Sequence, residues 1–118
     1  MALVSGIETV FFQVCNMDRA IAFYEGVLGL TLGRREGNDW AEFSVGGAEI
    51  ALAGELAIPP KQGGATVVFK CEDVTALQTH LRAANAVTDD IEDMGDALSL
   101  EFNDPDGNRL VALQPAAK

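Results

Sequence analysis

The sequence predicts an α+β fold made of two copies of a βαβββ module. Two pairs of segments predict the duplication. Residues 42–52 and residues 101–113 each have the pattern of a strand, a glycine turn and a second strand. Upstream, residues 14–17 and residues 70–73 each end an apolar run and begin a helical stretch. One copy of such a unit cannot bury its own apolar face, so we expect the two copies to pack together and to form a cleft.

The length of 118 residues fits a single domain over residues 1–118, large enough to bury a modest core. Within it we expect module one at 5–56 and module two at 64–116. The segment 54–64 is rich in glycine and proline and falls between the two repeats, where a connection is required.

Residue type and spacing predict the elements of the first module in order. Residues 7–14 are rich in β-branched and aromatic side chains, as is typical of a strand. Asn16 can cap a helix whose apolar side chains recur at helical spacing as far as Leu28, and Gly29 ends that helix. A hairpin turn is expected at 46–47. The remaining strands of this module are expected at 30–34, 40–45 and 49–53.

The second module repeats this order. A strand at 65–71 is followed by a helix that Asp73 caps and Asn85 ends. The acidic run 89–96 is expected to be a solvated hairpin end. Residues 104–108 resemble a calcium loop only superficially, and we expect a turn there. The last three strands are expected at 87–91, 98–102 and 109–114.

Composition narrows the classes of function. The formal net charge of −10 argues against nucleic acid and against anionic membrane surfaces as partners. The acidity is explained either by solubility or by attraction of a cationic small molecule. No apolar stretch approaches the ~18 residues of a membrane span, and no signal peptide is visible, so a cytoplasmic location is expected.

Strand alternation predicts which side chains face away from the helices. Alternate residues of the third expected strand are apolar and pack on the helix, so Trp40 and Glu42 point to the opposite, concave side. The same argument places Glu101 on the concave side of the second module, and Phe11 and Gln13 on that of the first. The predicted ligand-binding surface therefore comprises Phe11, Gln13, Trp40, Glu42 and Glu101.

Two motifs resemble those of a known family. The stretch VCNMDRAIAFYEGVLGL at 14–30 resembles the opening signature of the vicinal oxygen chelate superfamily, which contains glyoxalases, extradiol dioxygenases and bleomycin-resistance proteins. DPDGNRLV at 104–111 is similar to its closing signature. The resemblance covers essentially the whole chain. It implies paired βαβββ modules forming a U-shaped, partly open mixed sheet with the helices on the convex side, and it implies a homodimer.

The chain departs from that family at the metal-binding positions. Enzymes of the family usually hold a divalent metal with one His, Glu or Gln from each of four strands. Aligned on the two motifs, these positions hold Thr9, Ala51, Thr66 and Val111. Alanine and valine have no donor atom, and neutral threonine binds divalent ions poorly. We therefore expect no metal and no cofactor, although a slipped alignment would bring in Glu8 and Glu49. His80, the only histidine, is expected on the second helix.

The sequence favours a metal-independent small-molecule binding protein over an enzyme, and it assigns no catalytic residue. Bleomycin-resistance proteins are similar: small, acidic, metal-free members that sequester a cationic drug. Glu42 and Glu101 would attract a cationic or amine-bearing compound, and Trp40 would offer an aromatic face.

Two alternatives remain open. One is a lyase, isomerase or dioxygenase with a displaced metal site, or with Glu42 or Glu101 as general base. The other is a subunit or regulator whose cleft binds nothing in isolation.

Overall fold

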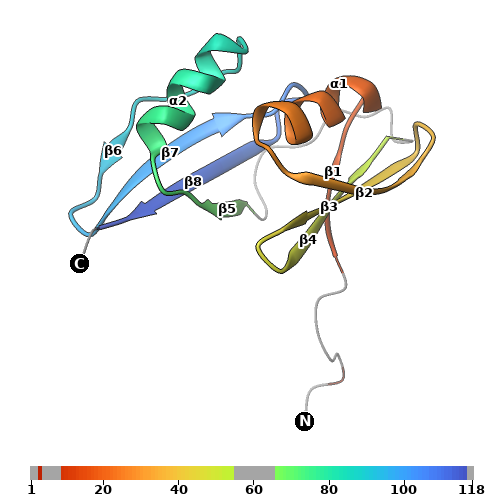
Figure 1. The fold of residues 1–118 in the computed structure, drawn as a ribbon, viewed down its shortest axis with the longest axis horizontal. Coiled ribbons are helices and arrows are strands. Elements are labelled where there is room, and N and C mark those ends of the chain that lie inside the picture. Colours follow the sequence, from red (N-terminus) through yellow and green to blue (C-terminus); the bar gives the residue numbers. More distant parts are fainter. Residues whose placement is uncertain (1–2, 4–8, 55–65, 117–118) are drawn as a thin grey trace. The chain divides into compact units, whose positions relative to one another are not determined.

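The computed structural model describes residues 3, 9–54 and 66–116 (Figure 1). The chain divides into two compact units, Met1–Pro59 and Pro60–Lys118. Each unit holds a four-stranded mixed sheet and a helical segment. The predicted α+β class with two βαβββ modules is confirmed. Within the ranges just given, no helix is long and apolar enough to cross a membrane.

The first unit has strand order β1-β4-β3-β2, with β1 parallel to β4 and the other pairs antiparallel. α1 packs against β3 and β4, so one face of this sheet is covered by the helix. The elements are β1 (Val10–Gln13), α1 (Met17–Ile21), its π-helical continuation η1 (Ala22–Val27), β2 (Thr31–Glu36), β3 (Trp40–Val45) and β4 (Ala48–Ala53).

The second unit repeats this topology, with strand order β5-β8-β7-β6 and β5 parallel to β8. α2 packs against β7 and β8. The elements are β5 (Val67–Lys70), α2 (Val74–Ala83), β6 (Glu92–Asp93), β7 (Ala97–Asn103) and β8 (Arg109–Pro115).

The predicted helix caps are confirmed. The Asn16 side chain accepts a hydrogen bond from the Arg19 backbone N–H at 3.0 Å. Asp73 does the same for Ala76 at 3.0 Å. Both bonds satisfy N–H groups that the first helical turn leaves unpaired. Asn85, with φ of 61°, terminates α2 in the left-handed conformation that asparagine tolerates.

The prediction of a strand at 87–91 is wrong. Only Thr88 pairs there, as an isolated bridge to Phe102, and the outer strand β6 begins later. The physical reason lies at Asp89, whose carbonyl accepts a hydrogen bond from the Gln78 side chain of α2 at 2.9 Å. Its carboxylate bonds to Arg109 of β8. Backbone hydrogen bonds still join residues 87 and 89 to β7, but the Asp89 carbonyl bonds to a side chain and the ladder does not continue to residue 91. Asp89 is therefore not simply solvated.

The core of the first unit is aromatic. Tyr24 is fully buried and lies 6.2 Å from Phe12 and 5.8 Å from Phe43, measured between ring centroids. Phe23 meets it edge-on at 5.5 Å. Burial of each such side chain contributes roughly 1.5–3 kcal/mol. Because Phe12 and Phe43 point to the helix, their strand neighbours point to the opposite face of the sheet.

The turn at 104–108 is a side-chain-bonded turn, as expected. Asp104 Oδ1 accepts the backbone N–H groups of Asp106 and Asn108 at 2.9 and 2.8 Å. Its Oδ2 accepts from the Asn108 side-chain amide at 2.8 Å. Both carboxylate oxygens therefore hold the loop that connects β7 to β8.

Candidate functional site

The sheet of the first unit presents an aromatic and acidic surface on the side away from α1, which we call the first open face. The Trp40 indole N–H donates a hydrogen bond to Glu42 Oε2 at 2.8 Å. The rings of Phe11 and Trp40 lie 5.6 Å apart with an interplanar angle of 55°. Phe11 is 47% exposed, which is unusual for so large an apolar side chain. Three of the predicted ligand-binding residues thus lie together.

Small residues of β4 allow the two rings to meet. In the sheet register Ala51 lies between Phe11 of β1 and Glu42 of β3, and Ala53 lies opposite Trp40. β1 and β3 are separated by β4, a spacing of about 9.5 Å between backbones. The rings therefore lean towards each other over β4, where both alanines are buried. Larger side chains at these positions would keep the rings apart.

The first open face carries more negative than positive charge. Arg34 of β2 forms an ion pair with Glu36. The two side chains are also hydrogen-bonded, and this bond to Glu36 raises the pKa of Arg34 above its usual value. The negative charges of Glu36, Glu42 and Glu49 raise it further. Three carboxylates around one guanidinium leave a local excess of negative charge, which favours cationic ligands.

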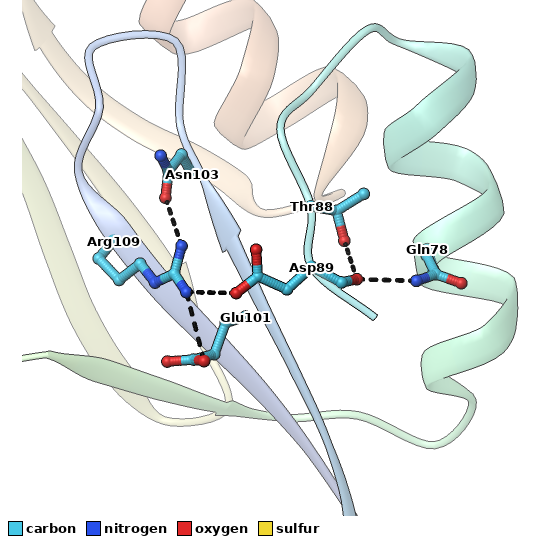
Figure 2. A network of polar contacts seen from close by, with 6 residues as sticks. All are labelled: Gln78, Thr88, Asp89, Glu101, Asn103 and Arg109. Atoms are coloured by element: carbon cyan, nitrogen blue, oxygen red, sulfur yellow. Dashed lines mark hydrogen bonds and ion pairs between the residues drawn. The ribbon is translucent and has the colours of Figure 1, made fainter. Parts of the chain in front are cut away.

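The corresponding side of the second unit, the second open face, is organised around Arg109 (Figure 2). Its Nη2 donates to Asp89 Oδ2 at 2.6 Å and lies 3.3 Å from Glu101 Oε2. Its Nη1 donates to Asn103 Oδ1 at 3.2 Å. The hydrogen bond to Asp89 raises the pKa of Arg109 above its usual value, and the charge of Glu101 contributes.

The five predicted ligand-binding residues thus divide between the two units. Gln13 is half-buried at the end of β1, two residues after Phe11 and opposite Ala53. Glu101 lies in β7 of the second unit and forms an ion pair with Arg109.

Sequence reasoning missed Arg109. The strand pattern could have indicated it. Leu110 and Ala112 of β8 are buried against α2, so alternation places Arg109 on the opposite face of the sheet, together with Glu101.

The positions aligned with the family's metal ligands do not fit a divalent ion. Ala51 and Val111 occupy equivalent places, opposite Glu42 and Glu101 respectively, and neither has a donor atom. Among the residues of the two described stretches, no three His, Cys, Asp or Glu side chains come together as a metal-holding group. Glu8 lies outside the described residues, and His80 is exposed on α2.

Two βαβββ units, each with one sheet face covered by a helix and one left open, define a class of small α+β proteins built by duplication. The sequence matches the Glyoxalase/Bleomycin resistance protein/Dioxygenase superfamily over residues 6–112. The chain belongs to this superfamily.

Individual relatives have varied activities. The metallothiol transferase FosB of Shouchella clausii is 31% identical, over 92% of this chain and 79% of that protein. Among solved structures, the fosfomycin resistance protein FosX from Listeria monocytogenes superposes with a TM-score of 0.81 at 14% identity, over 97% of this chain and 96% of that one. TnmS3, an antibiotic binding protein from a Streptomyces species, gives 0.73 at 21% identity, over 98% and 100%. At these identities the structural matches show the fold alone.

Proposed function

We propose that this protein binds a cationic or amine-bearing small molecule and sequesters it, without a resident metal. The observation that carries the proposal is the hydrogen bond from Trp40 to Glu42 beside the exposed ring of Phe11. It combines an apolar aromatic platform with an oriented carboxylate on one open sheet face.

The chemistry of these groups favours an ammonium ligand. An indole face attracts a cation through its quadrupole, which contributes about 0.5–2 kcal/mol depending on desolvation. The bond from Trp40 uses one oxygen of the Glu42 carboxylate, so the other can accept a hydrogen bond from a ligand N–H. The excess of carboxylates around Arg34 and the overall charge of −10 strengthen the attraction.

The remaining predicted residues take supporting roles. The amide of Gln13 can donate to and accept from polar groups of the ligand. Glu101 is the equivalent carboxylate on the second open face, where its ion pair with Arg109 weakens its attraction for a cation. The antibiotic binding assigned to TnmS3 supports a sequestering role on this fold. We further propose a homodimer, which sedimentation equilibrium would test.

The test uses Trp40, the single tryptophan of the chain, as a fluorescent probe. Spermidine, doxorubicin and other amines are titrated beside neutral and anionic compounds of similar size, at low and high salt. Cations should quench or shift the emission, and their binding should weaken as salt rises. Glu42→Gln should weaken spermidine binding about tenfold or more, since a hydrogen bond to a charged group contributes ~1.5–3 kcal/mol. Equal binding of anions, or no effect of salt, would overturn the proposal.

A second candidate is an enzyme, and the likeness to FosB over most of the chain favours it. In that case the protein would join a thiol to an antibiotic such as fosfomycin or act as a lyase or isomerase. The purified protein is incubated with fosfomycin and L-cysteine, with and without added Mn²⁺, and followed by phosphorus NMR. Formation of an adduct, together with stoichiometric metal in elemental analysis, would replace the binding proposal.

The glutamate-base version of the enzyme has a separate test. A bell-shaped pH profile of any activity found, lost in Glu42→Gln or Glu101→Gln, would support a carboxylate general base.

A further inference from the structure

We propose that Arg109 determines the charge specificity of the second open face, because it acts as an internal cation that competes with ligand ammonium groups for Glu101 and Asp89. The inference rests on the proposed binding of cationic compounds and adds to it a residue that directs them to Glu42 instead of Glu101.

The two glutamates occupy equivalent places but bond to different partners. Glu42 pairs with Ala51 across β3 and β4, and Glu101 pairs with Val111 across β7 and β8. Glu42 accepts from the neutral indole of Trp40. Glu101 lies 3.3 Å from a guanidinium nitrogen. The duplicated position therefore keeps its carboxylate while its effective charge differs between the units.

Arg109 is well held in this role. Its guanidinium reaches acceptors on β7 and on the connection between α2 and β6, as Figure 2 shows. Its side chain is 41% exposed, so a soluble cation can approach the carboxylates from the same side. A ligand ammonium that reaches Glu101 or Asp89 meets the positive charge of Arg109 and must displace it.

Asp89 stays in position without the arginine. Its backbone N–H donates to the Glu101 carbonyl at 2.9 Å, and its carbonyl accepts from Gln78 at 2.9 Å. Replacement of Arg109 by glutamine therefore leaves two neighbouring carboxylates on a framework that other bonds maintain. Without Arg109, the two neighbouring carboxylates attract a cation more strongly than they do when the guanidinium is paired with them.

The experiment is a spermidine titration of nitrogen-15-labelled protein, followed by the backbone amide shifts of each sheet. In the wild type we expect shifts on β3 and β4 around Glu42, and little change on β7 and β8. In Arg109→Gln we expect shifts around Glu101 and Val111, with an affinity at that face raised roughly fivefold, the scale of partly exposed ion pairs. Arg109→Lys should behave like the wild type.

Arg82→Gln is the matched control. Arg82 is an exposed residue of α2 that forms an ion pair with Asp90 at 3.8 Å, and its loss changes the net charge equally. The proposal is overturned if Arg82→Gln and Arg109→Gln strengthen binding equally, if wild-type shifts are as large around Glu101 as around Glu42, or if Arg109→Gln gives no shifts on β7 and β8. The same titration also tests the proposed function by itself. If spermidine causes no amide shifts around Glu42 in the wild type, the function proposal fails.

Discussion

Trp40 and Glu42, two residues apart on β3, are joined by a hydrogen bond of 2.8 Å on the face of the sheet that the helix leaves open. Residues at this spacing point to the same side of a strand. The bond fixes the carboxylate beside the indole ring, so the acidic and aromatic parts of the surface have a defined geometry before any ligand arrives.

Trp40→Phe should keep the ring and lose the N–H donor. We expect spermidine to bind about threefold more weakly, because Glu42 loses the bond that orients it and phenylalanine is a weaker cation–π partner than tryptophan. Isothermal calorimetry measures the change, since the variant has no fluorophore of its own. Unchanged affinity would show that the indole N–H does not prepare the carboxylate.

Ala51→Leu should separate the rings of Phe11 and Trp40. The position is fully buried, and extra methylene groups in a packed site cost about 1–3 kcal/mol. The urea midpoint should fall, and the emission of Trp40 should move to longer wavelength as the ring becomes solvated. Ala48→Leu, at the exposed start of the same strand, is the control and should change neither.

Gly54→Ala should destabilise the first unit by roughly 2 kcal/mol or more, through backbone displacement. A Cβ there would lie 2.1 Å from the Asn38 carbonyl oxygen and 3.1 Å from the end of the Met17 side chain. Gly33→Ala is the matched control, because its new Cβ would meet only an ordinary contact at 3.6 Å. Thermal unfolding of the two variants side by side tests the contrast, and equal melting temperatures would contradict it.

Asp104→Ala should cost roughly 3 kcal/mol or more. The buried carboxylate accepts two backbone N–H groups and the side-chain amide of Asn108, and each donor left unsatisfied costs ~1–3 kcal/mol. Chemical denaturation gives the loss of stability. Asp106→Ala, on a half-buried turn residue, should cost less. Equal losses in the two variants would argue against a special role for Asp104.

Much of the fold could be predicted because local signals agreed with one another. Asn16 and Asp73 both follow a strand and precede helical spacing, and both cap a helix in the structure. Alternation also predicted the side of β3 on which Trp40 lies. The strand expected at 87–91 is cut short because side chains of Gln78 and Arg109 bond to the carbonyl and the carboxylate of Asp89, so that regular pairing with β7 does not continue past this residue.

The sequence could predict which residues lie on the open faces, but not which side chains bond to one another there. Alternation identifies Glu42 and Glu101 as members of open faces, but it treats the two alike. The distinction comes from contacts: Arg109 reaches Glu101 from the neighbouring strand, and it reaches Asp89 across 20 residues of sequence. Periodicity within one strand contains no information about such partners.

The equivalent register of Glu42 and Glu101 has an evolutionary consequence. A duplicated gene first encodes two identical surfaces, and a single codon change at position 109 suffices to alter the charge of one of them. The aromatic and acidic groups of the other surface stay unchanged, because residue 109 takes no part in the hydrogen bond between Trp40 and Glu42. Selection can therefore change the charge of one repeat without altering the hydrogen bonds of the other.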